Sequence, residues 1–153
     1  MPTVVHSPAD LLGLVGADLG TTDWVEVTQD RIVLFADATG DHQWIHVDVE
    51  RAEAESPFGG PIAHGYLTLS MVNLFLPELL TVEGASMGVN VGLEKVRFPS
   101  PVPVGSNLRL GAQLDAVDEI GGGWSQISMT FTFEVEGASK PACVAEIIFR
   151  YQE

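Results

Sequence analysis

The longest apolar stretch of the chain, residues 66–80, limits the folds open to it. Its sequence, "YLTLSMVNLFLPELL", is too short to span a membrane and is interrupted by Asn73, Pro77 and Glu78. Its apolar residues occupy every side of a helical wheel, so we expect a helix that is buried all round. The rest of the fold must therefore enclose this helix.

Four stretches that alternate apolar and polar residues follow. This period of two is typical of β-strands with one buried face. The stretches are residues 87–93, 108–116, 127–135 and 143–151. The glycine-containing connections "DEIGGGWS" and "VEGASK" predict hairpins, so the strands should be mostly antiparallel. The proline-rich "FPSPVPVGS" predicts a crossing between strands, because proline cannot donate to a central ladder.

These elements predict an α+β fold of the hot-dog type, in which a curled antiparallel sheet surrounds one central helix. One sheet cannot cover a helix on all sides, so we infer a partner subunit or a strongly curled sheet. The length of 153 residues fits a single domain, residues 1–153.

The first third of the chain predicts shorter elements. Ser7 caps a short helix in "PADLLGLVG", and "TDWVEV" predicts a brief strand. Thr28 caps a helix over "QDRIVLFADAT", which Gly40 ends. The segment "ERAEAESPFGGPIAHG" begins as a helical turn and continues as a loop.

Composition excludes several classes of partner. The net charge is −14, from 21 acidic and 7 basic residues, and this charge repels phosphate backbones and anionic lipid headgroups. We therefore expect no nucleic-acid and no membrane partner. The N-terminus lacks the pattern of a signal peptide, so we expect a cytoplasmic protein. Cys143, the one cysteine, should be a buried apolar residue, and a reducing compartment fits.

The motif "ATGDHQWIHVD" places Asp41 five residues before His46. On one helix this spacing would separate the side chains by about 140°. On one strand it would separate them by roughly 16 Å, on opposite faces. The two can meet only across a turn, so we expect them on a loop after Gly40. A carboxylate beside an imidazole can share and activate a water molecule. The alternative is a surface loop in which Asp41 caps a turn.

A metal site is not expected in this motif. His42 and His46 have the spacing of two ligands on a helix, but the glutamate of an "HExxH" pattern is missing and Gly40 breaks the helix. We expect His42 to face solvent.

A second motif, "GGPIAHGYLTLS", opens the apolar helix at His64 and Gly65. The first N–H groups of a helix have no partner within it and carry partial positive charge. Gly65 lets a ligand approach the backbone closely, so an oxygen gaining negative charge would be stabilised there. The alternative is that Gly65 only allows helix and sheet to pack tightly.

Together, the two motifs resemble those of the MaoC-like hydratase family of the hot-dog superfamily. "FADATGDHQWIHVD" resembles the hydratase-2 signature, in which Gly-Asp is followed by a variable residue, Asn-Pro, an aliphatic residue and His. The likeness continues through "GGPIAHGYLTLS" and "LEKVRFPSPVPVGS" and covers the chain from about Val25 onward. Gln43 and Trp44 stand where the signature has Asn-Pro, so a hydrogen bond from that Asn is expected from Gln43 or is absent.

The family is known for (R)-specific enoyl-CoA hydratases, which add water across the 2,3 double bond of a trans-2-enoyl thioester. The resemblance implies that Asp41 and His46 are the catalytic pair and that the Gly65 N–H binds the thioester oxygen. It also implies a homodimer. The reaction requires no metal or redox cofactor.

Further residues are candidates for binding the substrate. An apolar tunnel for the acyl chain, or plain core, is expected from Trp44, Phe58, Leu67, Met71 and Phe75, and His64 lies beside Gly65. Lys95, Arg97 and Arg51 are candidates for binding coenzyme A at the mouth, or are solvated charges. An acyl carrier protein is the alternative carrier, but its acidity disfavours it.

Two other functions stay open. A thioesterase also uses an acid or base near a helix N-terminus, but its water attacks C1 rather than C3. The order of Asp41 and His46 upstream of the helix favours a hydratase. Gln43 and Trp44 keep open a non-catalytic acyl-thioester-binding subunit.

Overall fold

The computed structural model describes residues 1–153. The helices are the 3-10 helix η1 (Pro8–Leu14), α1 (Gln29–Thr39), α2 (Trp44–Val47), α3 (Val49–Glu55), α4 (Gly65–Ser70) and α5 (Val72–Leu79). The strands are β1 (Thr3–Val5), β2 (Asp18–Thr21), β3 (Val25–Glu26), β4 (Leu80–Val82), β5 (Met87–Arg97), β6 (Asn107–Gly121), β7 (Trp124–Val135) and β8 (Cys143–Gln152).

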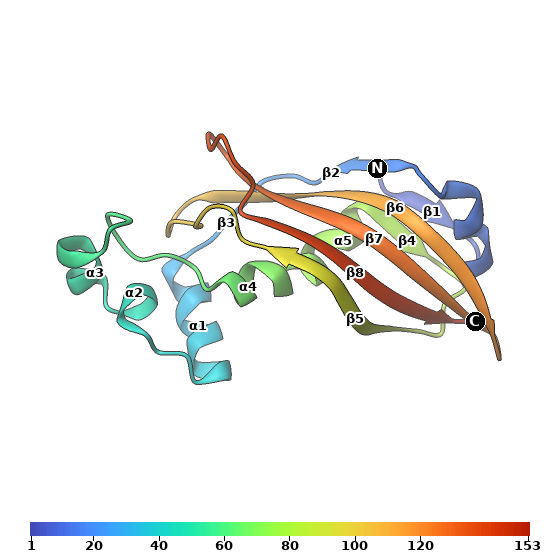
Figure 1. The fold of residues 1–153 in the computed structure, drawn as a ribbon, viewed down its shortest axis with the longest axis horizontal. Helices are drawn as coiled ribbons and strands as arrows, with labels where there is room; N and C mark the ends of the chain where they lie inside the picture. The colour runs from blue at the N-terminus through green and yellow to red at the C-terminus, as the bar shows by residue number, and fades with distance from the viewer.

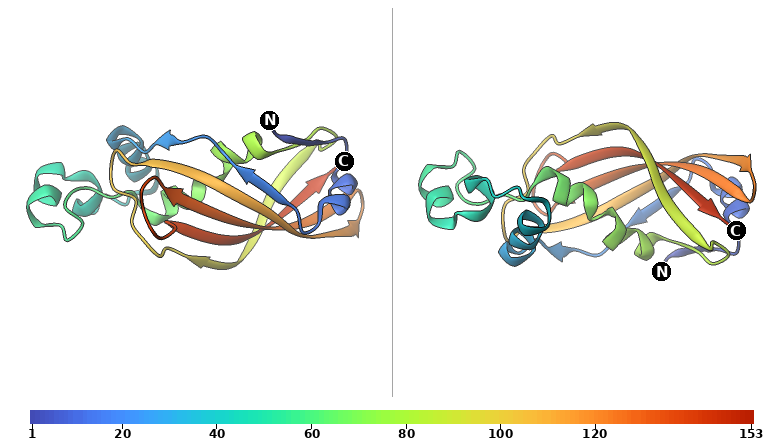
Figure 2. Two further views of the ribbon diagram at one scale, coloured as in Figure 1. Left: turned by 90° about the horizontal axis from the view of Figure 1, so that it is seen from above. Right: turned by 90° about the horizontal axis from the view of Figure 1, so that it is seen from below.

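An antiparallel sheet and the helices that cross one of its faces form the fold (Figures 1 and 2). The strand order is β2-β6-β7-β8-β5, and β3 also pairs with β6. Helices α4 and α5 run along the sheet, whereas α1, α2 and α3 lie beyond one of its ends (Figure 1). Strands β1 and β4 form a separate parallel pair. The predicted α+β hot-dog architecture is confirmed.

The predicted hairpins are also confirmed. Strands β6 and β7 stay paired up to Gly121 and Trp124. Gly121, Gly122 and Gly123 all have positive φ, of 87°, 65° and 77°, which explains why this turn is made of glycine. Strand β8 pairs antiparallel with β7, across the second predicted connection.

The central helix differs from the single helix predicted over residues 66–80. It is divided at Met71 into α4 and α5. The Ser70 hydroxyl donates to the carbonyl of Tyr66 at 2.6 Å, a bond that bends helices because it competes with the backbone ladder. The helix is also not buried all round, since Tyr66 is 73% and Leu74 44% exposed. Part of the side of the helix away from the sheet is therefore uncovered.

The other predicted helices are present with changed details. Thr28 caps α1 by accepting from the Arg31 N–H at 3.2 Å, and Gly40 ends it with φ of 81°. The segment capped by Ser7 is a 3-10 helix rather than an α-helix, and the predicted strand in "TDWVEV" is reduced to β3. Strands β1, β2 and β4 were not expected, because three or four residues are too few to establish an alternating pattern.

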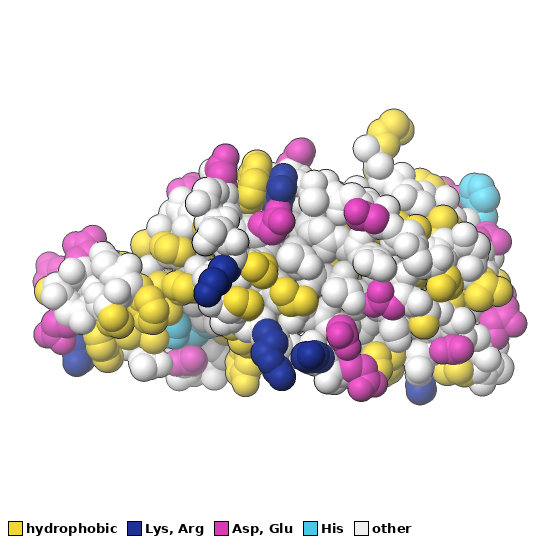
Figure 3. Space-filling view, turned by 45° about the horizontal axis from the view of Figure 1, so that its top comes forward, with side chains coloured by type: hydrophobic (Ala, Val, Ile, Leu, Met, Phe, Trp, Pro, Cys, Tyr) yellow, Lys and Arg dark blue, Asp and Glu magenta, His cyan; other side chains and the backbone are white.

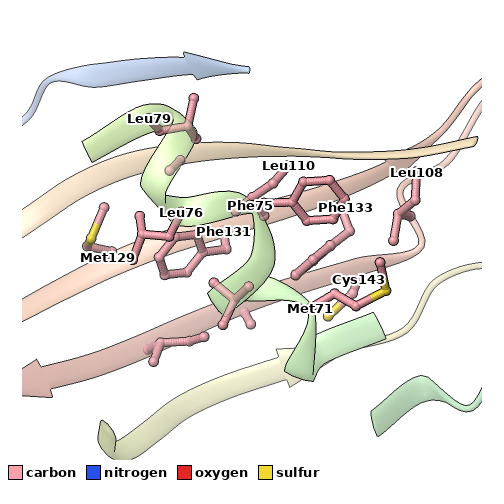
Figure 4. Close-up of a cluster of buried hydrophobic side chains, with 14 of the residues drawn as sticks. Met71, Phe75, Leu76, Leu79, Leu108, Leu110, Met129, Phe131, Phe133 and Cys143 are labelled. Atoms are coloured by element: carbon pink, nitrogen blue, oxygen red, sulfur yellow. The ribbon is translucent and has the colours of Figure 1, made fainter. Parts of the chain in front are cut away.

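The core lies between the sheet and α5 (Figure 4). Phe75 of α5 is fully buried and its ring centroid lies 6.4 Å from that of Phe133 on β7. Along β7, alternate residues are buried, as the period of two predicts, and Phe131 and Met129 share the face of Phe133. This packing fixes where α5, and hence α4, lies on the sheet.

Strand β5 is an exception to the alternating pattern. It is an edge strand, and it is exposed along almost its whole length. Its four alternating apolar residues are 41–49% exposed: Met87, Val89, Val91 and Leu93. Irregularities in the register between Asn90 and Gly92 and between Leu93 and Lys95 disturb the alternation. The sequence pattern therefore identified a strand but did not predict its exposure.

Cys143 is fully buried in β8, as predicted. Burial raises the pKa of its thiol to about 11. Because the thiolate is the reactive form, we expect Ellman's reagent at pH 8 to leave the folded protein unlabelled and to titrate one thiol in denaturant. Rapid labelling of the native protein would contradict this burial.

No helix of the structure has the length and the apolar character needed to cross a bilayer.

Candidate active site

Asp41 lies in a short loop directly after α1. Gly40 ends that helix in a left-handed conformation, with its N–H donating to the Ala36 carbonyl at 2.8 Å. The Asp41 carboxylate is exposed and accepts from the Gln43 N–H at 3.4 Å. The turn predicted between Asp41 and His46 is therefore present.

His46 lies on the one-turn helix α2, not on the loop that the spacing predicted. It is 6% exposed, and its Nδ1 bonds to the Ile62 carbonyl at 2.7 Å. A carbonyl can only accept, so Nδ1 carries the hydrogen and Nε2 keeps a lone pair. Gln29 of α1 donates to the His46 carbonyl at 2.8 Å and holds α2 in place.

Asp41 and His46 converge, and His64 is a third member of the cluster. A carboxylate oxygen of Asp41 and one ring nitrogen of each histidine lie within 4.8 Å of one another. Two groups no more than 4.8 Å apart can both hydrogen-bond to one water molecule, because each such bond spans about 2.8 Å. One water molecule can therefore bridge Asp41 and His46.

The surroundings of His46 keep its imidazole neutral. Burial is the largest effect and lowers the pKa of His46 below the ordinary 6.5, and the nearby His64 ring acts in the same direction. The hydrogen bond to Ile62 and the charge of Asp41 oppose this shift. A neutral imidazole with a free lone pair is suited to accept a proton near neutral pH.

His64 stands immediately before α4 and is 3% exposed. Its Nε2 bonds to the backbone carbonyl of Asp41 at 2.9 Å. Its ring stacks on His46, with 3.8 Å between centroids and 25° between planes, and lies 4.9 Å from the ring of Phe35. Its Nδ1 is buried and has no hydrogen-bond partner.

Asp41, His46 and His64 are the residues that could hold a metal ion. A metal bound by histidine lies about 2.0–2.1 Å from nitrogen, along the in-plane lone pair. Two nearly parallel rings 3.8 Å apart cannot both direct a lone pair at one such ion without reorienting. The stacked arrangement is better suited to a water molecule.

A cavity of about 360 Å³ begins at Gly65. It is lined by Phe58, Ile62, Ala63, Gly65, Thr68, Phe98, Pro99, Ser100, Pro101, Val102 and Ala142. A Cβ atom at Gly65 would lie 3.2 Å from the Phe98 ring, so any larger residue here would have to displace that ring slightly. Two residues singled out in the sequence, Gly65 and Phe58, thus share one cavity, whereas Asp41 and His46 do not line it.

The other candidate binding residues are dispersed. Leu67, Met71 and Phe75 belong to the core, which was the alternative for the tunnel residues. Trp44 does not line the cavity; the Arg51 guanidinium lies 4.3 Å above its ring and pairs with Glu55 at 3.0 Å, so Arg51 is not a free charge.

Gln43 and His42 are both exposed on the loop. The Gln43 side chain makes no hydrogen bond within the protein, so it does not replace the bond expected from an Asn at this position. His42 faces solvent, as predicted, and pairs with Asp37 at 2.9 Å.

Lys95 and Arg97 lie on one face of β5. They stand opposite Glu146 and Val144 of β8, and residues directly opposite in an antiparallel pair share a face. The alternate residues of β8 are the buried ones, so Lys95 and Arg97 lie on the outer face of the sheet. Helices α4 and α5 cover the inner face.

Sequence reasoning missed Phe98 and the stacking of His64 on His46. Phe98 is the first residue of the proline-rich segment "FPSPVPVGS", which predicted only a crossing between strands. No pattern in the sequence indicates the stack, because the two rings are brought together by the bond between His46 and Ile62, two residues before His64.

Fold and site together define a class of protein: a hot-dog domain with a carboxylate and an imidazole beside the start of its central helix. The chain belongs to the family of the MaoC like domain, whose model matches residues 11–136. The resemblance seen in the sequence is thereby confirmed. The chain is 53% identical over 146 residues to the 3-hydroxyacyl-thioester dehydratase Z of Mycobacterium tuberculosis, covering 95% of this chain and 96% of that protein.

Solved structures share the fold at lower identity. A monoamine oxidase regulatory protein from Archaeoglobus gives a TM-score of 0.79 at 22% identity, covering 100% of this chain and 98% of the other. The (R)-hydratase from A. caviae involved in PHA biosynthesis gives 0.68 at 21% identity, covering 88% and 94%. These structures support the hot-dog fold independently of the sequence motifs.

Proposed function

We propose that the protein is a hydro-lyase that adds water to trans-2-enoyl thioesters to form (R)-3-hydroxyacyl thioesters, and that catalyses the reverse dehydration. The observation that carries the proposal is the convergence of the Asp41 carboxylate with the ring of His46, which bonds to Ile62 through Nδ1 and so keeps a lone pair on Nε2. The name of the dehydratase from M. tuberculosis supports the same chemistry. Residues 1–153 act as a single domain in this proposal.

The steps follow from the residues present. His46 Nε2 takes a proton from the water that Asp41 orients, and the hydroxide adds to C3 of the enoyl thioester. The electron pair of the double bond moves to the thioester oxygen, where the Gly65 N–H stabilises the enolate. The proton on His46 passes to the Asp41 carboxylate, and Asp41 then gives it to C2, which returns both side chains to their starting states. No step uses a cofactor.

The substrate enters from the side of Gly65. The cavity lined by Phe58 and Phe98 is mainly apolar, as an acyl or pantetheine chain requires. His64 precedes Gly65 at the start of α4 and is buried behind this end of the cavity. Gln43 and Trp44 complete the turn between Asp41 and His46. Lys95 and Arg97 are the cations proposed for coenzyme A; they lie on the outer face of β5, so the coenzyme would reach them around the edge of the sheet, beside Phe98 of the cavity wall. A strongly acidic protein needs such local cations to bind a polyanion.

The test is a hydration assay with crotonyl-CoA and longer enoyl-CoA substrates. We expect loss of enoyl absorbance without release of free thiol, and a 3-hydroxyacyl product of the (R) configuration. Release of thiol would instead identify a thioesterase. Binding of enoyl-CoA in calorimetry with no turnover would identify a non-catalytic subunit.

The pH dependence of kcat/KM should reflect the lowered pKa of His46. Because its pKa is lowered, His46 stays neutral below pH 6.5, so kcat/KM should fall only at a pH lower than 6.5. The unfolded chain binds a proton on this histidine at about 6.5. The free energy of unfolding should therefore decrease as pH drops from that value through the folded pKa.

NMR titration of the histidine rings checks this prediction. His42 is an internal reference, because its pKa is shifted in the opposite direction: the hydrogen bond to Asp37 raises it above 6.5. If His46 titrated together with or above His42, a neutral base at position 46 would be contradicted.

We propose further that the working unit is a homodimer formed along β5. The edge strand and the adjacent helix expose Leu93, Leu74 and Tyr66, and a groove of about 310 Å³ separates Leu93 from Val72. An exposed apolar edge invites pairing with another strand, and a second copy offers a self-complementary one. The resemblance to the MaoC-like family supports this assembly.

Replacing Val91 and Leu93 together by glutamate should convert the dimer to a monomer, because it places charge on the edge that pairs. Size-exclusion chromatography with light scattering measures the mass directly. The control replaces Leu12 and Val15 of the η1 region by glutamate; they are 59% and 47% exposed, against 45% and 49% for Val91 and Leu93, and are distant in sequence from β5. A wild-type mass of one chain, near 16.4 kDa, would contradict the proposal.

A further inference from the structure

His64 is the member of the cluster to which the proposed reaction assigns no step. It nevertheless contacts both members of the proposed catalytic pair. Its Nε2 donates to the backbone carbonyl of Asp41 at 2.9 Å, and its ring stacks on His46 with 3.8 Å between centroids. It is almost fully buried, so solvent does not compete for these contacts. A residue so placed can control the geometry between the two.

Each histidine bonds through its ring to the backbone of the segment that carries the other histidine. His46 bonds through its ring to the carbonyl of Ile62, and His64 bonds through its ring to the carbonyl of Asp41. A third bond joins the Ile62 N–H to the Ile45 carbonyl at 3.0 Å. The bond from His64 is the one that connects the Ile62–His64 segment to the backbone of Asp41. The Asp41 carboxylate itself is exposed.

The hydrogen bond to Asp41 is the one polar contact of the His64 ring within the protein. Nε2 must carry the hydrogen that the Asp41 carbonyl accepts. Nδ1 is buried and has no hydrogen-bond partner. The ring is therefore held by the bond from Nε2 and by its stack on His46.

We propose that His64 is a positioning residue: its Nε2–H holds Asp41 opposite His46, and its ring supports the imidazole of the base by stacking on it. The inference rests on the proposed function, in which Asp41 and His46 act as the pair. The titratable groups near His46 are Asp41 and His64; its other polar contacts, Gln29 and the Ile62 carbonyl, carry no charge.

Two substitutions separate the hydrogen bond from the ring. His64→Phe keeps an aromatic ring between Phe35 and His46 but removes the donor to Asp41. We expect kcat to fall by about 10²-fold with KM changed by less than about 3-fold, because misplacing a reacting group by an ångström has this effect. His64→Gln places an amide nitrogen near the position of Nε2, so it should retain at least about a tenth of the wild-type kcat.

The matched control is His42→Gln, the same replacement at the solvent-exposed histidine of the catalytic loop, which should leave kcat unchanged. The inference is overturned if His64→Phe keeps kcat within about 3-fold of wild type, or if His64→Gln loses as much as His64→Phe. Equal losses would mean that the bond to Asp41 is not what matters.

A second readout does not depend on activity. In His64→Gln the imidazole neighbour of His46 is gone, so NMR should show the pKa of His46 rising toward 6.5 relative to wild type. A protein that hydrates no enoyl thioester would refute the proposed function and leave this measurement interpretable. An unchanged His46 titration would refute the role of His64 even in an active enzyme.

Discussion

Asp41→Asn and His46→Gln should each reduce kcat for enoyl-CoA hydration by about 10²-fold or more, since a positioned acid or base typically contributes this factor. Both replacements keep the shape of the side chain and remove its capacity to exchange a proton. His46→Gln can still donate to the Ile62 carbonyl and so preserve the tie of α2 to the neighbouring segment. The loss should therefore appear in kcat rather than in folding.

Steady-state kinetics with crotonyl-CoA measures this effect, and circular dichroism shows whether the fold is retained. The double variant should lose little more than either single variant, because residues that act as one unit are not additive. His42→Gln in the same loop should behave as wild type. Near-normal turnover in both single variants would eliminate the proposed mechanism while leaving the fold and family unaffected.

The sequence predicted the parts of this fold that repeat a local pattern. The alternation in β6, β7 and β8 was readable because these strands lie in the sheet with one face on the core. The alternation in β5 was equally clear, but periodicity cannot distinguish an edge from a central strand, so its exposure was not predicted. The break at Met71 follows a side-chain hydrogen bond from Ser70 to the Tyr66 carbonyl, and helical periodicity does not report such a bond.

In the candidate site, too, the features with a local sequence pattern were predicted and the long-range contacts were not. A five-residue spacing after a helix-ending glycine was enough to require a turn between Asp41 and His46, and the turn is present. The stack of His64 on His46 joins residues 18 positions apart in the sequence and has no local signature. Contacts of this kind depend on which backbone segments pair, and a single sequence does not contain that information.

Phe75→Ala should lower the free energy of unfolding by about 3–5 kcal/mol, the usual cost of deleting a fully buried phenylalanine. Phe75 is 0% exposed, and its ring lies against Phe133 on the sheet (Figure 4). The substitution leaves a cavity between α5 and β7 that neighbouring side chains can fill only in part. Urea unfolding followed by tryptophan fluorescence measures the change, at one protein concentration because an oligomer's stability depends on it.

Phe58→Ala is the matched control, since it deletes the same side chain where it is 47% exposed, and it should cost less than about 1 kcal/mol. Comparing the Phe75 and Phe58 variants separates an effect on folding stability from an effect on substrate binding. Hydrophobic side chains are visible on the surface toward the end of the molecule that carries α2 and α3, at the left of Figure 3. Phe58 lines the cavity at Gly65. Phe58→Ala should therefore raise KM for enoyl-CoA in a protein of nearly normal stability. Equal destabilisation by both substitutions would contradict the placement of Phe75 in the core and Phe58 at the cavity wall.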